Sequence, residues 1–171
     1  MADELVDVVD ENDEVIGQEM KSECHRKGIW HRVAGVLLFS SEGKIWLQTR
    51  IKNKTLQGRN LDFSASGHLA IGDTYEKGAQ REMEEELGIK TKLRDSGIKI
   101  FEDYIYDENS RVNHVIKLFM GKHDGPFKIQ KEELEDIKAY SLEEIKKLMK
   151  KNPPIITEGL RLILKEYFKQ K

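Results

Sequence analysis

The chain has a single cysteine, Cys24, among its 171 residues. A lone cysteine cannot form an intramolecular disulfide, so a disulfide-stabilised secreted scaffold is excluded and a reducing cytoplasm is the expected location. No stretch approaches the ~20 apolar residues that cross a bilayer. The acidic start, MADELVDVVDENDEV, also lacks the basic residues and apolar core of a signal peptide. We therefore expect neither a membrane-spanning helix nor a secretory signal.

The sequence also lacks an excess of charge of either sign, with 29 Lys and Arg against 31 Asp and Glu and a formal net charge of −2. A general nucleic-acid binder normally carries a basic excess that neutralises many phosphates, so this class is not expected, although nucleotides remain acceptable as small ligands. The length suits one domain. We predict a single domain over 1–171, with an N-terminal hairpin at 1–20, a core at about 30–140 and C-terminal helices at about 141–170.

Hydrophobic periodicity and turn-forming residues predict the secondary structure. Strands are expected at 5–9, 15–16, 33–39, 45–47, 61–66, 98–106, 112–120 and 137–140, and helices at 73–87, 141–151 and 157–169. The first helix is expected to begin at a capping box formed by Asp73 and Glu76 and to end at Gly88. The segment 21–28 is polar and basic, and we assign it no element. This order predicts the α/β (α+β) class, as an α/β/α sandwich in which a mixed sheet packs between helices.

The predicted helix at 73–87 carries an acidic face. Because successive helical residues are about 100° apart, Glu82, Glu85 and Glu86 fall within an arc of roughly 100°. An apolar stripe that can pack on the sheet lies beside them, formed by Tyr75, Ala79, Met83 and Leu87. Like charges at this spacing repel, and hard cations such as Mg²⁺ or Mn²⁺ prefer oxygen ligands. A metal ion is therefore expected at this face, and the alternative is a solvated acidic face.

The residues around the acidic face resemble the Nudix box, G-x5-E-x7-R-E-U-x-E-E-x-G-U, in which U is aliphatic. The match runs from Gly67 to Ile89 and departs only at Asp73, where the family has Glu. The resemblance implies the Nudix α/β/α sandwich and hydrolysis of a diphosphate linked to a further group. It also implies that Mg²⁺ or Mn²⁺ is held by Glu82, Glu85, Glu86 and the Gly67 carbonyl.

One more carboxylate must accept the proton of the attacking water. Glu82 is one candidate, and the resemblance adds three more on the loop before the last strand, Glu132, Glu133 and Glu135. We predict Glu82, Glu85 and Glu133 as the catalytic residues. Arg81 is expected to orient Glu85.

The flanking sequence resembles the Nudix branch that contains isopentenyl-diphosphate isomerase. In that enzyme, residues resembling Lys21, Arg50 and Lys54 hold the substrate diphosphate, and we predict the same role for them here. The catalytic residues of the isomerase are not preserved. Ser66 stands where its catalytic cysteine is expected, and Val112 and His114 stand where two glutamates belong.

Histidines resembling His25, His31 and His68 bind a metal in the isomerase. Together with His114 they are candidates for a second metal site in this chain, since imidazole suits Zn²⁺ or Mn²⁺. The alternative is that His31 and His114 are hydrogen-bonded strand residues and that His25 is solvated.

These features predict a Mg²⁺- or Mn²⁺-dependent Nudix hydrolase that acts on a nucleoside di- or triphosphate or a related pyrophosphate. One alternative is an isopentenyl-diphosphate isomerase with altered catalytic residues, and another is a non-catalytic nucleotide-binding module. The expected partner is a small-molecule nucleotide or diphosphate, with no nucleic acid and no membrane. The sequence is also compatible with a homodimer.

Overall fold

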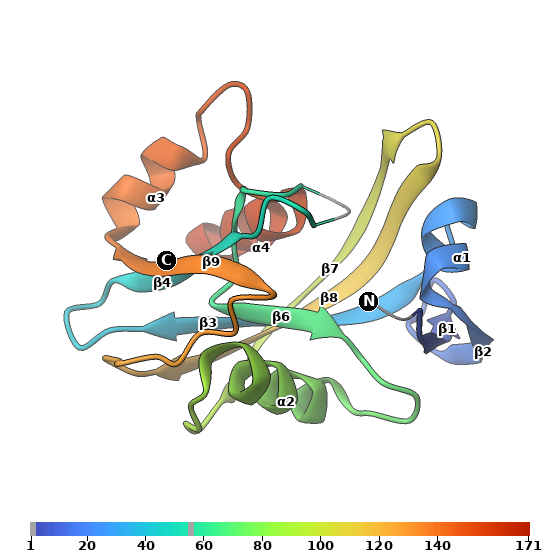
Figure 1. Cartoon of the computed structure of the whole chain (residues 1–171), viewed down its shortest axis with the longest axis horizontal. Coiled ribbons are helices and arrows are strands. Elements are labelled where there is room, and N and C mark those ends of the chain that lie inside the picture. The colour runs from blue at the N-terminus through green and yellow to red at the C-terminus, as the bar shows by residue number, and fades with distance from the viewer. Residues whose placement is uncertain (1–2, 55–56) are drawn as a thin grey trace.

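The computed structural model describes residues 3–54 and 57–171 (Figure 1). Residues 1–2 of the predicted hairpin and residues 55–56 lie outside this description. The strands are β1 (Leu5–Val9), β2 (Val15–Met20), β3 (His31–Phe39), β4 (Ile45–Arg50), β5 (Leu61–Asp62), β6 (Ala65–His68), β7 (Arg94–Asp107), β8 (Ser110–Lys122) and β9 (Leu134–Tyr140). The helices are α1 (Lys21–Lys27), α2 (Tyr75–Leu87), α3 (Leu142–Leu148) and α4 (Glu158–Lys169).

Strand β3 is the centre of the sheet. It pairs antiparallel with β1, β4 and β6 and parallel with β8. The other pairs, β1 with β2, β4 with β5 and β9, and β7 with β8, are antiparallel. The described residues therefore form a nine-stranded mixed sheet, which confirms the predicted mixed topology.

The two faces of the sheet carry separate apolar cores, because successive residues of a strand point to opposite faces. On β3, Ala34 belongs to the core that contains Met83 of α2. Its alternate neighbours, Val33 and Leu37, belong to the core that contains Leu164 of α4. Helices α2 and α4 thus cover opposite faces of the sheet (Figure 1), which confirms the predicted sandwich.

The start of helix α2 differs from the prediction. The N-cap is Thr74, whose Oγ1 accepts a hydrogen bond from the Lys77 amide at 3.1 Å, so the helix does not begin at an Asp73 capping box. Asp73 is one residue too early, and its carboxylate is instead paired with Arg81. The end of the helix is as predicted, since Gly88 has φ 64° in the left-handed region that glycine adopts without strain.

The segment from 21 to 27 forms helix α1, which the sequence pattern did not indicate. Only Cys24 of this short helix is buried, so its sequence carries almost no apolar periodicity. Gly28 ends the helix with φ 73°. Because of this helix, His25 faces the sheet from a neighbouring element rather than from an extended loop.

Within residues 3–54 and 57–171, no helix has both the length and the apolar character that crossing a membrane requires.

Close packing at Gly35 on β3 gives the first testable prediction. A Cβ atom at this position would lie 2.7 Å from Cε1 of Phe63. Gly35→Ala should therefore lower the free energy of unfolding by about 1–3 kcal/mol, which is typical of overpacking a core. Urea denaturation followed by circular dichroism measures the loss. Gly17→Ala is the matched control, because no atom lies within 4 Å of its added Cβ. Equal stability of the two variants would contradict the close contact with Phe63.

Candidate functional site

Helix α2 places its three motif glutamates at different depths beside β6. Glu86 is 6% exposed, Glu82 is half-buried and Glu85 is exposed. Oε1 of Glu86 accepts a hydrogen bond from the Ser66 amide at 2.8 Å and from Nε2 of Gln48 at 3.4 Å. The innermost carboxylate is therefore fixed against the sheet. Gln48 was not predicted as part of the site.

Gly67 lets Glu82 approach the backbone of β6. A Cβ atom at Gly67 would lie 2.3 Å from the carboxyl carbon of Glu82, which is far inside van der Waals contact. The carboxylate thus fills the space that a side chain at this position would need. The structure brings Gly67, Glu82 and Glu86 together as the sequence predicted, and we refer to these residues with Glu85 as the glutamate site.

The electrostatics of the glutamate site suit a cation. Burial, reinforced by the negative charge of Glu85, raises the pKa of Glu82 to about 7. Burial and the charge of Glu82 raise the pKa of Glu86 well above its ordinary value. Arg81 acts on Glu82 and Lys54 on Glu86 in the opposite direction, but neither offsets the burial. Buried carboxylates of this kind are costly unless they are paired or bind a metal, so the donor set fits a hard divalent ion.

The ion pair of Arg81 is with Asp73 rather than with Glu85, although the charge of Glu85 also raises the pKa of Arg81. Its guanidinium pairs with Asp73 through Nη1 and donates from Nη2 to the carbonyl of His68 at 3.2 Å. Burial favours the neutral acid at Asp73, but the hydrogen bond and charge of Arg81 outweigh it and hold the pKa of Asp73 below its ordinary value. Arg81 therefore ties the start of α2 to the end of β6. The shorter Asp73 side chain still reaches this arginine.

The three loop carboxylates proposed as bases lie in different surroundings. Glu133 is half-buried and forms an ion pair with Lys54, and its charge raises the pKa of Glu82. Glu135 is exposed, with its Oε1 at 3.7 Å from Nε of Arg59, and Glu132 is exposed. Among these three, Glu133 is the one whose charge acts on the glutamate site.

The three predicted phosphate-binding cations each have an acidic partner. Nζ of Lys21 lies 3.1 Å from Oε1 of Glu4, and Nη1 of Arg50 lies 2.9 Å from Oδ2 of Asp62. Lys54 pairs with Glu133. The three cations act on different groups. Lys21 and Arg50 lower the pKa of His114, whereas Lys54 lowers the pKa of Glu86.

Four histidines from separate elements meet on the sheet face that α4 covers. They are His25 of α1, His31 of β3, His68 of β6 and His114 of β8, and we call them the histidine centre. One ring nitrogen of each lies within 4.8 Å of the others. Nε2 of His114 lies 3.2 Å from Nε2 of His25 and 3.3 Å from Nε2 of His68. All four histidines singled out in the sequence are therefore brought together.

The histidine centre presents lone pairs rather than positive charge. Burial lowers the pKa of His25 and His114 to about 4 and lowers that of His31 and His68 well below its ordinary value. Nδ1 of His31 lies 2.9 Å from the carbonyl of Ile29, so this nitrogen donates and Nε2 keeps its lone pair. That Nε2 is buried and has no hydrogen-bond partner among the described residues. Convergent imidazole lone pairs of this kind fit a transition-metal ion such as Zn²⁺.

Glu102 of β7 is a neighbour of this centre that the sequence analysis missed. It is 3% exposed and is paired in register with His114 of β8. Burial, reinforced by Asp62, raises its pKa to about 8. Strand alternation could have indicated that Glu102 faces inward. Ile98, Ile100 and Glu102 occupy alternate positions of one strand, and Ile98 is buried in the core.

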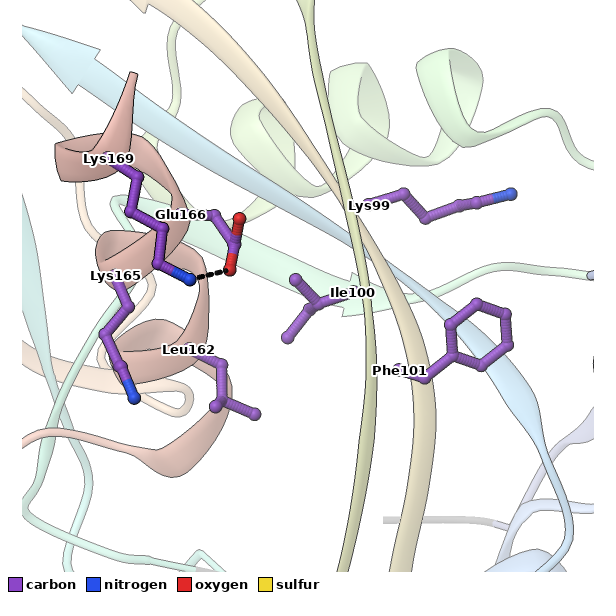
Figure 2. Close-up of a pocket in the computed structure, with 7 residues that line it drawn as sticks. All are labelled: Lys99, Ile100, Phe101, Leu162, Lys165, Glu166 and Lys169. Carbon is purple, nitrogen blue, oxygen red and sulfur yellow. Dashed lines mark hydrogen bonds and ion pairs between the residues drawn. The ribbon is translucent and has the colours of Figure 1, made fainter. Parts of the chain in front are cut away.

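A pocket of about 290 Å³ lies between β7 and α4, away from both groups of residues (Figure 2). Ile100 points toward Leu162 of α4, while Lys99 and Phe101 point to the other side of β7 (Figure 2). Lys169 forms a 3.1 Å ion pair with Glu166 at its edge. None of the residues that line this pocket belongs to the glutamate site or the histidine centre.

Comparison with known proteins gives consistent results. The sequence profile of the NUDIX domain family matches residues 29–159. The chain is 41% identical over 91 residues to a Nudix hydrolase of Nostoc sp., and it spans about half of that relative, 54%. It is 28% identical to isopentenyl-diphosphate Delta-isomerase 2 of Photorhabdus laumondii, over 95% of this chain and 91% of that protein. The crystal structure of DR0079 from Deinococcus radiodurans has a similar fold, with a TM-score of 0.76, 22% identity, and coverage of 96% of this chain and 99% of that chain.

Proposed function

Because the chain belongs to the Nudix family, we propose that it is a Mg²⁺- or Mn²⁺-dependent hydrolase. Its proposed substrate is a nucleoside di- or triphosphate, or a nucleoside diphosphate linked to another group, in which it cleaves a pyrophosphate bond. The observation that carries this proposal is a pair of carboxylates, of half-buried Glu82 and buried Glu86, packed against the backbone of β6 at Gly67 and Ser66. Two carboxylates placed this close together and partly removed from water are unfavourable unless they hold a cation.

In this proposal, the ion is held by Glu82, Glu85, Glu86 and the Gly67 carbonyl. A bound divalent ion supplies neutralisation of the charge that develops on the phosphoryl oxygens and activates the attacking water. Glu133 accepts the proton of that water at its carboxylate. The ion pair with Lys54 holds Glu133 beside the glutamate site.

The basic residues Lys21, Arg50 and Lys54 are proposed to bind the substrate phosphates. Each already has a carboxylate partner, so a bound diphosphate would compete with or join these ion pairs. Charge-assisted hydrogen bonds from Lys and Arg to phosphate are strong and, for Arg, directional.

We further propose that the histidine centre binds a second metal ion of the transition series. The unpartnered, buried Nε2 of His31 supports this, because a lone pair left without a donor in the protein interior is unfavourable. This second ion is separate from the Mg²⁺ or Mn²⁺ of the glutamate site. A cytoplasmic location and small-molecule substrates complete the proposal.

An assay with a panel of nucleotides tests the hydrolase proposal. Purified protein with Mg²⁺ should release phosphate or nucleoside monophosphate from at least one member, and a chelator such as EDTA should abolish the release until Mg²⁺ is restored. Activity should be lost on chelation because the carboxylates of the site are themselves negative, so only the cation can neutralise the charge on the phosphoryl oxygens. The similarity to the isomerase makes isopentenyl diphosphate a necessary member of the panel. Isomerisation of that compound with no pyrophosphate cleavage anywhere in the panel would overturn the proposal in favour of the isomerase.

A further inference from the structure

Glu102 has no role in the hydrolase proposal, yet it lies at a structurally defined position beside the histidine centre. It faces His114 across the β7–β8 pair, and its Oε2 lies 3.5 Å from Nδ1 of His114. Glu102 is buried and His114 is half-buried, and a buried glutamate is uncommon unless it has a partner. The other ring nitrogen of this histidine, Nε2, points into the centre toward His25 and His68.

We propose that Glu102 is the positioning residue that keeps the proton of His114 on Nδ1 and leaves Nε2 free to bind a metal ion. This inference rests on the proposed second metal site. Neutral imidazole carries its proton on one of two nitrogens, and an acceptor beside Nδ1 decides which one. The carbonyl of Ile29 has the same function for His31, at 2.9 Å.

Helix α4 also restricts the position of the Glu102 carboxylate. Gly159, near the start of α4, faces the carboxylate, and a Cβ atom there would lie 2.8 Å from Oε2 of Glu102. Glu102 is therefore held between α4 and His114. A helix residue with a side chain at position 159 would push the carboxylate out of place.

Charge balance gives a second, independent reason for a carboxylate here. Four neutral imidazoles leave the full charge of a divalent ion uncompensated in the sheet interior, and a buried charge needs an opposite charge nearby. The nearby Asp62 is already paired with Arg50 at 2.9 Å. With an ion bound in the centre, Glu102 would be favoured as the ionised carboxylate and would supply that charge beside His114, as carboxylates do behind metal-binding histidines in general.

Metal affinity of the full-length protein tests this role directly. Protein stripped of metal is titrated with Zn²⁺ against a chromophoric chelator and with Co²⁺ by visible absorption. Glu102→Gln keeps the side-chain length but removes the charge, and it should weaken binding of both ions by about 10- to 100-fold, the usual cost of losing such a partner. Asp103→Asn is the matched control, since Asp103 is the next residue on β7, exposed, and bonded to Asn113 at 3.0 Å. It should bind as the wild type does.

Two further variants make each outcome decisive. His25→Ala defines the site, because it should eliminate the Co²⁺ absorption. Glu102→Asp keeps a carboxylate on a shorter side chain and should recover part of the metal affinity. If Glu102→Gln does not fold, Glu102→Asp is compared with Asp103→Asn instead. Weaker metal binding in Glu102→Asp then supports the role, and equal binding overturns it. Wild-type affinity in folded Glu102→Gln would overturn the role of Glu102 alone. Metal binding that His25→Ala leaves unchanged would overturn the second metal site together with it, and neither result bears on Mg²⁺-dependent hydrolysis.

Discussion

Glu86→Gln should reduce Mg²⁺-dependent pyrophosphate hydrolysis by about 1,000-fold or more, since metal ions contribute several kcal/mol of transition-state stabilisation and each ~1.4 kcal/mol is a factor of ten. The amide has nearly the same shape as the acid, and its oxygen can still accept from the Ser66 amide. The variant should therefore fold, with a melting temperature equal to or above that of the wild type, because it removes a buried acid whose pKa burial already raises. The measurements are kcat with the best substrate of the panel and thermal unfolding by circular dichroism.

The control for this substitution lies on the same helix. Glu84 is exposed, so Glu84→Gln removes an equal charge from α2 without touching β6. It should keep activity within a few-fold of the wild type. Comparable activity in Glu86→Gln and Glu84→Gln would show that Glu86 is not a metal ligand, whereas unfolding of Glu86→Gln alone would point to a structural role.

Gly67→Ala should cost about 100-fold in hydrolysis, the scale expected when a catalytic group is displaced by about 1 Å. The reason is steric, because the added methyl group would lie 2.3 Å from the carboxyl carbon of Glu82 and must push this carboxylate away. Steady-state kinetics over a range of Mg²⁺ concentrations measures the effect, which should include a higher Mg²⁺ requirement. Gly17→Ala again serves as the control.

A double variant separates displacement of Glu82 from a general disturbance of β6. If Gly67→Ala acts through Glu82, adding it to Glu82→Gln should cost less than the sum of the two single effects, since contacting residues are not independent. Full additivity would refute the steric link between Gly67 and Glu82, as would unchanged Mg²⁺ dependence in Gly67→Ala.

The sequence was sufficient to predict helix α2 and its acidic face, because both depend on local information. The apolar spacing and the Gly88 stop are contained within one helix, and the structure agrees with both. The exact cap was not predictable, because Asp73 and Thr74 are both good N-cap residues and the choice depends on the contact between Asp73 and Arg81. Helix α1 has too few buried residues to leave a periodic signal.

For the histidine centre, the sequence shows the four histidines but not that their side chains lie together in the fold. His31 and His114 are neighbours because β3 and β8 pair in parallel in one particular register. Such long-range pairing leaves no local pattern, so only the resemblance to the isomerase suggested it. Strand alternation could have placed Glu102 on the inner face of β7, but its position opposite His114 depends on the pairing of β7 with β8, which leaves no local pattern.

Strand β6 links the two candidate metal sites, because its consecutive residues Gly67 and His68 serve opposite faces of the sheet. Gly67 faces Glu82 and α2, and His68 belongs to the histidine centre. A deletion of one residue within β6 would reverse which face each following side chain points to. It would place the imidazole against Glu82 and withdraw it from the other histidines. An insertion or deletion within β6 would therefore disrupt both sites at once, although point substitutions can alter either site separately.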